Sequence, residues 1–252
     1  MNVSTIYPRV VACSVTLLSG LALAGCTPGA APPVPANTAS APPARSAASS
    51  LSRSSRVLTE PTTTNTLPPP PPPTAPAPST AGGLSARSLP IPTGWRTAIL
   101  AGGDEEGFHG NGTWVHARDP RYAAQDVIAL GCIPVTRDDY TDPSAALEGN
   151  YQNRSGDRGI GLVLEFPDEQ AATKYLDLYQ RQIWACTRRN QPVRTAIVPG
   201  VARLVDRRTY PDSEWTEIVE RNGSRITLII LADPGHSITK ASAKRILDQI
   251  GS

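Results

Sequence analysis

The sequence is poor in aromatic and apolar residues and rich in proline. Of its 252 residues, 5% are aromatic and 39% are hydrophobic, whereas 26 are proline. So many prolines with so little apolar surface indicate that a large part of the chain does not bury a core. The prolines cluster in the first hundred positions, so we expect the folded part to follow them.

The chain also lacks a basic excess in its folded part. The formal net charge is +2 overall, but Leu89–Ser252 carries 19 Lys and Arg against 21 Asp and Glu. The basic surplus therefore lies before Leu89. A nucleic-acid-binding domain needs a basic face, so nucleic acid is not expected as a partner.

Motifs for catalysis and for metal binding are missing as well. The three histidines do not form a His-Glu-x-x-His motif, and there is no Gly-x-Ser-x-Gly elbow. The acidic turn at residues 138–142 lacks the alternating pattern of a calcium loop, and the glycine-rich run 102–112 lacks the Lys of a phosphate loop. We therefore expect no cofactor, no metal and no enzymatic activity. Residues of a catalytic triad can lie far apart in the sequence, so a divergent envelope hydrolase remains an alternative.

The first residues are typical of an export signal. Arg9 precedes an apolar run, Val10–Ala24, that is too short for a membrane-spanning helix. The run ends in Leu23-Ala24-Gly25-Cys26, which resembles the lipobox of bacterial lipoproteins. The resemblance implies that residues 1–25 are removed and that Cys26 is lipidated, with palmitate among the acyl chains. It also implies that the protein is extracytoplasmic and anchored to the cell membrane. Several acyl chains give stable anchoring where one is marginal.

Residues 26–88 form the predicted tether. The segment is rich in Pro, Ala, Ser and Thr, with Pro68–Pro73 unbroken, and such a composition favours disorder with polyproline II character. Fully extended, about 60 residues would reach on the order of 190 Å. We expect a spacer that holds a single domain, residues 89–252, away from the membrane.

Short apolar runs between turn residues predict a strand-rich domain. Asn222-Gly223 between two such runs is a strong hairpin signal. Residues 145–151 fit either a short helix or an extended approach to the strand Ile160–Phe166. The predicted strands are Trp95–Leu100, Thr113–Ala117, Asp126–Cys132, Ile160–Phe166, Val193–Val198, Val201–Val205, Glu214–Arg221 and Ser224–Leu231.

Two longer segments have helical periodicity. In the first, apolar residues recur at helical spacing from Ala172 to Cys186, and Asp168 can cap its start. The second follows Ser237 or Thr239 as its cap. The predicted fold class is therefore α+β: a mainly antiparallel sheet with two long helices packed on it, preceded by a disordered Pro-rich linker.

After removal of the leader and lipidation of Cys26, only Cys132 and Cys186 remain as thiols. In an oxidising compartment two cysteines in one domain favour a disulfide, here worth roughly 4 kcal/mol in the chain-entropy model. Free thiols or a metal pair are the alternative, but no further ligands cluster nearby.

The stretch Cys132–Cys186 resembles the PknH-type extracellular sensor domain. The likeness rests on Tyr140, the Gly-rich approach 156–161, the apolar strand that ends in Phe166, and Trp184-Ala185-Cys186. The resemblance implies sensing or binding, not catalysis. That family usually carries two disulfides, and this sequence offers one. Residues 91–95 also resemble the start of small Mog1/PsbP-like lipoproteins, which would imply an assembly factor that binds another envelope protein.

Candidate contacts for a ligand or an anion lie around the end of the first predicted helix. They are Trp184, Arg188, Arg189 and Arg194. A solvated basic edge and a buried aromatic stripe explain the same residues without a ligand. The sequence thus predicts a cell-envelope lipoprotein whose sensor-like domain binds an unidentified ligand or protein.

Overall fold

The computed structural model describes residues 67–104 and 106–251. The predicted signal peptide, Cys26 and the first part of the predicted tether, up to residue 66, lie outside the described residues. None of the described helices is long and apolar enough to cross a membrane.

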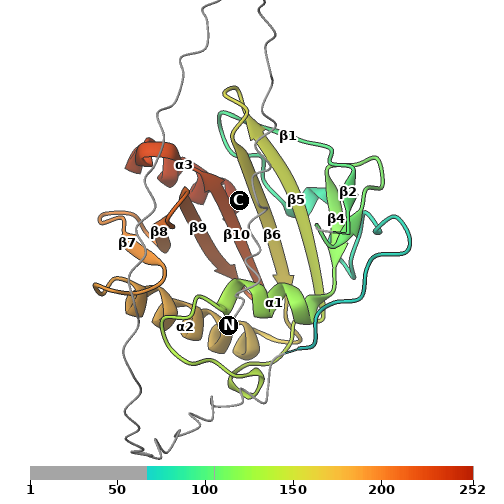
Figure 1. Ribbon diagram of the computed structural model, residues 1–252, viewed down its shortest axis with the longest axis horizontal. Coiled ribbons are helices and arrows are strands. Elements are labelled where there is room, and N and C mark those ends of the chain that lie inside the picture. The colour runs from blue at the N-terminus through green and yellow to red at the C-terminus, as the bar shows by residue number, and fades with distance from the viewer. Residues whose placement is uncertain (1–66, 105, 252) are drawn as a thin grey trace, which may run out of the picture. The chain divides into compact units, whose positions relative to one another are not determined.

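An eight-stranded antiparallel sheet forms the centre of the domain (Figure 1). Its order is β1-β5-β6-β10-β9-β8-β7, and β4 pairs with β5 beside β1. A separate pair, β2 and β3, lies within the glycine-rich run. The bounds are β1 Trp95–Thr97, β2 Gly102–Gly103, β3 Phe108–His109, β4 Val115–Arg118, β5 Ala145–Asn153, β6 Arg158–Glu165, β7 Arg194–Ile197, β8 Leu204–Thr209, β9 Glu214–Asn222 and β10 Arg225–Ala232.

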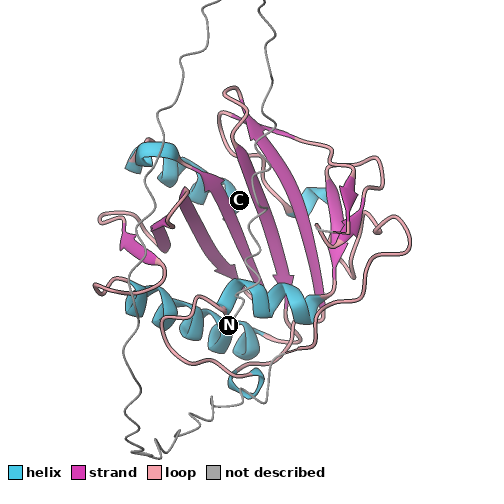
Figure 2. Cartoon of the chain, in the orientation of Figure 1, coloured by secondary structure: helices cyan, strands magenta, loops and turns pink. Residues whose placement is uncertain are grey.

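Helices cover both faces of this sheet. α1 (Pro120–Ile128) and α2 (Glu169–Cys186) share one hydrophobic core with one face, and α3 (Lys240–Ile250) packs in a second core on the other. In Figure 2, α1 and α2 lie toward one end of the strands and α3 toward the other. The predicted α+β class is confirmed, with α1 in addition to the two long helices. Short 3-10 turns occur at Ala86–Ser88, Arg137–Asp139 and Pro234–His236.

Several helices and turns form where short sequence signals predict them. Asp168 Oδ1 accepts a hydrogen bond from Ala171 N at 2.8 Å and so caps α2, as predicted. Thr239 caps α3. Asn222 pairs with Arg225 across the β9–β10 turn, where Gly223 has φ +58°. A left-handed conformation of this kind favours glycine.

The predicted strand Asp126–Cys132 is wrong. Its first residues complete α1, and the rest form a loop. Asp119 caps the helix and Pro120 occupies its first turn, so the helix is already established when the apolar run begins. Val127 and Ile128 then extend the buried stripe of this helix. Residues 145–151, left open between a short helix and an extended segment, belong to β5.

The last part of the predicted tether packs on the domain. Residues 67–88 are described, and Leu84 is buried in the core shared with α3. Ala77 N donates to His109 O at 2.9 Å, and His109 Nε2 lies 3.0 Å from Pro73 O. The packed structure therefore begins earlier in the chain than residue 89.

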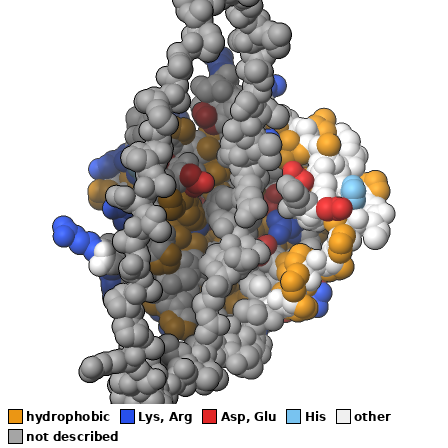
Figure 3. All heavy atoms as spheres, in the orientation of Figure 1, with side chains coloured by type: hydrophobic (Ala, Val, Ile, Leu, Met, Phe, Trp, Pro, Cys, Tyr) orange, Lys and Arg blue, Asp and Glu red, His pale blue; other side chains and the backbone are white. Residues whose placement is uncertain are grey.

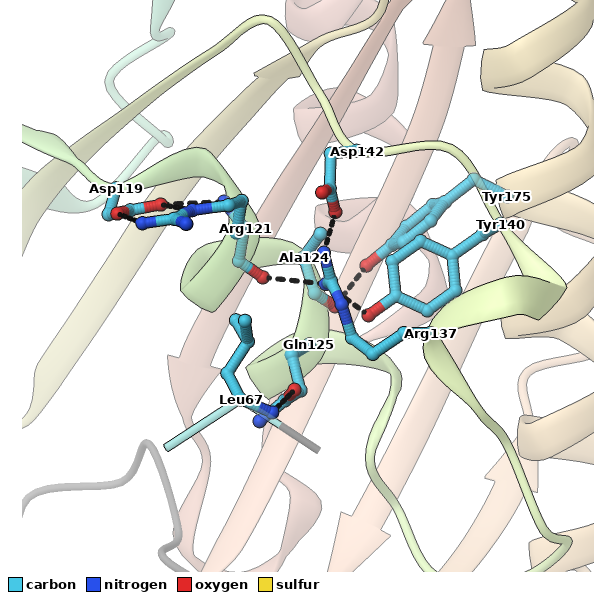
Figure 4. A network of polar contacts seen from close by, with 9 residues as sticks. All are labelled: Leu67, Asp119, Arg121, Ala124, Gln125, Arg137, Tyr140, Asp142 and Tyr175. Carbon is cyan, nitrogen blue, oxygen red and sulfur yellow. Dashed lines mark hydrogen bonds and ion pairs between the residues drawn. The ribbon is translucent and has the colours of Figure 1, made fainter. Parts of the chain in front are cut away.

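A polar network fastens α1 to the neighbouring loop and to α2 (Figure 4). The Tyr175 hydroxyl of α2 donates to Ala124 O at 2.7 Å, and this hydrogen bond is buried. Arg137 donates to the Tyr140 hydroxyl at 2.9 Å and also pairs with Asp142. Arg137 also donates to Arg121 O of α1, so the network holds α1 against both α2 and this loop.

Candidate functional site

A cavity of about 220 Å³ lies between α1 and the sheet. Its floor comes from β5, β6, β9 and β10, with side chains of β4 and β8 at its ends. Its cover comes from α1, the loop at residues 129–131 that follows it, and residues 192–193 before β7. The cavity thus draws on most of the folded chain.

The middle of the cavity is apolar. Ile160 and Leu162 of β6 and Ile230 of β10 form the floor, and Val127 and Val193 lie on the covering side. Strand alternation explains this floor, because every second residue of each strand points toward α1 and α2. An apolar centre with charged ends is the usual lining of a small-molecule site.

One end of the cavity carries the Arg118 cluster, which consists of Arg118, Asp126, Glu148 and His116. Arg118 donates to Glu148 Oε2 at 2.5 Å and to Asp126 Oδ2 at 2.9 Å. His116 Nε2 lies 3.6 Å from Glu148 Oε1, and the imidazole stacks on Phe108 at 3.7 Å. Burial lowers the pKa of His116, which favours the neutral ring.

Solvent reaches this first cluster. The side chains of Arg118 and Asp126 are 20% and 25% exposed. Burial nevertheless raises the pKa of Asp126, although the Arg118 charge opposes that shift. The cluster therefore lies at the boundary between water and the protein interior.

The opposite end carries the Arg208 cluster, which consists of Arg208, Asp206, Glu217 and Tyr179. Arg208 donates to the Tyr179 hydroxyl at 2.7 Å, lies 3.4 Å from Asp206 Oδ2 and pairs with Glu217. The side chains of Arg208, Asp206 and Glu217 are at most 2% exposed. Burial raises the pKa of Asp206 to about 7 and also raises that of Glu217. Asp206 and Glu217 face each other across β8 and β9.

The two clusters have the same stoichiometry. Each sets one guanidinium against two carboxylates, so each has one carboxylate in excess. A buried carboxylate without its own cation is unfavourable unless it takes up a proton or receives a donor from elsewhere. Each end of the cavity can therefore bind a further positively charged or hydrogen-bond-donating group.

The disulfide holds the cover of the cavity in place. Cys132 and Cys186 are bonded, which confirms the predicted pairing, and their Cα atoms lie 5.3 Å apart. Gln182 of α2 donates to Ile133 O at 2.9 Å and accepts from Ile133 N at 3.2 Å. Both contacts join α2 to the loop that follows α1. The cross-link therefore ties α2 to the loop whose residues 129–131 cover the cavity.

The candidate ligand contacts predicted from the sequence lie elsewhere. Trp184 is 59% exposed on the outer side of α2 and borders a shallow depression with Lys174 and Arg181. Arg188, Arg189 and Arg194 are exposed, and none of the four lines the cavity. Figure 3 shows Lys and Arg side chains on the side of the view where α3 and β7 lie.

The sequence contained one overlooked signal for the cavity. Glu217 alternates with Trp215 and Val219, both buried, so its carboxylate occupies an inward position of a strand. Arg208 and Asp206 likewise share the face of Leu204. Charged residues at inward strand positions indicate either a buried ion pair or a site.

The polar groups of the lining are arginines, carboxylates and the Tyr210 hydroxyl. Ser, Thr, Cys and Lys are absent from the described residues that line the cavity. Within the described part of the chain, no group of three or more His, Cys, Asp or Glu residues is arranged to hold a metal ion.

Comparison with known proteins gives one structural match. No family model matches the chain, and no curated protein matches it. Among solved structures, the chain is similar to the extracellular domain of PknH from Mycobacterium tuberculosis, with 15% sequence identity and a TM-score of 0.34. The match covers 54% of this chain and 77% of that chain. This is a weak structural similarity to an extracellular domain.

Proposed function

We propose that the protein is a cell-envelope lipoprotein whose folded domain binds a ligand in the cavity and acts as a non-enzymatic sensor or binding module. The cavity carries the proposal, because it combines an apolar floor with converging polar groups. The Cys132–Cys186 disulfide fits an oxidising, extracytoplasmic location. In this proposal Cys26 holds the lipid and the Pro-rich segment spaces the domain from the membrane.

The test is a fragment screen followed by amide chemical-shift mapping on the full chain. Ile160→Trp fills the cavity from its floor and is expected to abolish shifts that wild type shows at cavity residues. Ile99→Trp is the matched control, because Ile99 is 65% exposed and does not line the cavity. Fragment binding that maps elsewhere, or that survives Ile160→Trp, would contradict the proposed site.

The anchor has a separate test. Growth with a labelled fatty acid is expected to label the wild-type protein and to leave Cys26→Ser unlabelled. A wild-type protein that stays unlabelled and retains its leader would refute lipidation without affecting the cavity.

A second candidate function is the assembly factor that binds another envelope protein. Trp184 favours it, because an exposed Trp beside cations is typical of interaction hot spots. Under this alternative Trp184→Ala abolishes capture of a partner from envelope extracts, whereas Ile160→Trp does not. The opposite result favours the cavity.

A further inference from the structure

We propose that the cavity binds an elongated dication, a ligand with an apolar middle and a protonated amine at each end. This inference rests on the proposed ligand-binding function and adds the chemical class of the ligand. It follows from the charge, the spacing and the lining of the two clusters.

The charge of the cavity is the first argument. Arg118 is shared by Glu148 and Asp126, and Arg208 is shared by Glu217 and Asp206. Together they set two guanidinium groups against four carboxylates, of which Asp126, Glu148 and Glu217 line the cavity and Asp206 is the cross-strand neighbour of Glu217. Two added positive charges, one at each end, would balance them.

Both guanidinium groups are already engaged. Arg118 uses two of its nitrogens for two carboxylates, and Arg208 contacts two carboxylates and the Tyr179 hydroxyl. An anionic ligand would therefore have to displace a bound carboxylate and bury another negative charge. Like charges brought together in a poorly solvated site are strongly unfavourable.

The buried end has an acceptor to offer. Glu217 is fully buried and lines the cavity, where it pairs with Arg208 and is hydrogen-bonded to Tyr179. The two oxygens of a carboxylate together accept about four hydrogen bonds. A ligand amine can therefore donate to Glu217 in addition to these two partners.

The exposed end has carboxylates that a ligand can reach. Asp126 is 25% exposed, and Glu148 lines the cavity beside it. Only one oxygen of Asp126 is bound to Arg118. A second amine can therefore be held here while it keeps part of its hydration.

The strand register sets the distance between the ends. Glu148 pairs with Leu162, Leu162 with Leu228, and Leu228 with Val219, two residues from Glu217. Three strand spacings and an offset of two residues place the Cα atoms of Glu148 and Glu217 about 16 Å apart. Both side chains point to the face of α1 and α2. The ligand must therefore be elongated, and Ile160, Leu162 and Ile230 between the ends require its middle to be apolar.

Calorimetry with ligands of one chain length tests the assignment. The probes are diaminooctane, octylamine, octanediol and octanedioate, added to the full chain carrying Cys26→Ser so that no lipid interferes. Diaminooctane is expected to bind at least tenfold more tightly than octylamine, and octanedioate not at all. Diamines with shorter chains are expected to bind more weakly, because they cannot span both clusters.

Substitutions at the two ends distinguish the outcomes. Asp126→Asn and Glu217→Gln are each expected to weaken diaminooctane binding about tenfold, which equals about 1.4 kcal/mol. Asp212→Asn, an exposed loop position outside the cavity, is the matched control and should leave binding unchanged. Asp126 lies at the partly exposed end, so its variant remains informative if Glu217→Gln does not fold.

Two failures have different meanings. If octanediol or octanedioate binds as tightly as diaminooctane and Ile160→Trp abolishes that binding, the cavity is a ligand site but the dication assignment is wrong. If no probe and no fragment binds in a manner sensitive to Ile160→Trp, the ligand-binding function itself is overturned, and the dication assignment with it.

Discussion

The two ends of the cavity share one composition and differ in their contact with water. In the Arg118 cluster Arg118 and Asp126 are partly exposed and Glu148 is buried, so solvent moderates the charge of Asp126. In the Arg208 cluster the one guanidinium and the two carboxylates are fully buried, so the extra negative charge reduces the stability of the fold. The two clusters therefore contain the same types of charged group but differ in effect. A ligand can reach the Arg118 cluster, whereas protonation of the Arg208 cluster is coupled to folding.

Removal of each arginine gives the largest expected difference between the ends. Arg208→Met leaves Asp206 and Glu217 buried without a cation and should reduce the free energy of unfolding by about 3–5 kcal/mol. Arg118→Met should cost less, because water can solvate Asp126, although Glu148 stays buried. Urea denaturation of both variants measures the two reductions in the free energy of unfolding. Equal reductions would show that the clusters do not differ in stability because of burial.

The disulfide is the next largest effect. Replacement of both Cys132 and Cys186 by Ser should reduce the free energy of unfolding by about 2–4 kcal/mol. Because the cross-link holds the cover of the cavity, water should also reach the Arg208 cluster more easily. The pKa of Asp206 is then expected to fall toward its ordinary value, which NMR titration of the carboxyl carbon measures. An unchanged pKa would mean that the cover stays closed without the cross-link.

The pH dependence of stability should have opposite signs at Asp206 and at His116. The pKa of Asp206 is raised from 3.8 to about 7, so the folded state binds this proton more tightly than the unfolded state. Its contribution therefore grows as the pH falls from about 7 to about 4, by up to about 1.4 kcal/mol per pH unit. The pKa of His116 is lowered, so its contribution is present above about 6.5 and is lost as the pH falls below that value.

Two variants separate these contributions. Asp206→Asn should reduce the gain on acidification, to which Glu217 and Asp126 also contribute, and His116→Gln should reduce the loss. Thermal unfolding between pH 5 and 8 measures both. A wild-type profile that Asp206→Asn leaves unaltered would contradict the raised pKa of the buried carboxyl group.

The smallest effect expected concerns the position of α1. Tyr175→Phe removes the hydrogen bond to Ala124 O and should reduce the free energy of unfolding by about 1 kcal/mol. Since this bond helps to hold the cover over both clusters, cavity amides should exchange hydrogen faster in the variant. Unchanged exchange would mean that the Arg137 contacts suffice to hold α1.

Much of the fold was predictable because its signals are local. The Asn222-Gly223 turn, the Asp168 cap and the apolar stripe of α2 each depend on a few adjacent residues. The strand predicted at residues 126–132 was wrong, because Val127 and Ile128 fit a strand as well as they fit the buried side of a short helix. The cap at Asp119 decided between them.

The cavity was less predictable because its residues meet only through strand register. Arg208 and Glu217 become partners when β8 pairs with β9, and Glu148 joins the same face through β6 and β10. A single shift in register would turn each of these charges outward. Trp184 and its neighbouring arginines drew attention because their pattern is local, and they lie on the outer surface.

The packed end of the Pro-rich segment has a consequence for association between molecules. Ala117 of β4 donates to Pro78 O at 2.7 Å, so this stretch of β4 is already bonded on the side away from β5. Proline has no N–H to offer a further strand, so the segment ends the ladder there instead of extending it. The opposite edge is β7, a short strand of four residues that carries the exposed Arg194. The β4 part of one edge is thus closed by a segment that cannot template another chain, and the opposite edge is short and charged, both of which disfavour edge-to-edge aggregation.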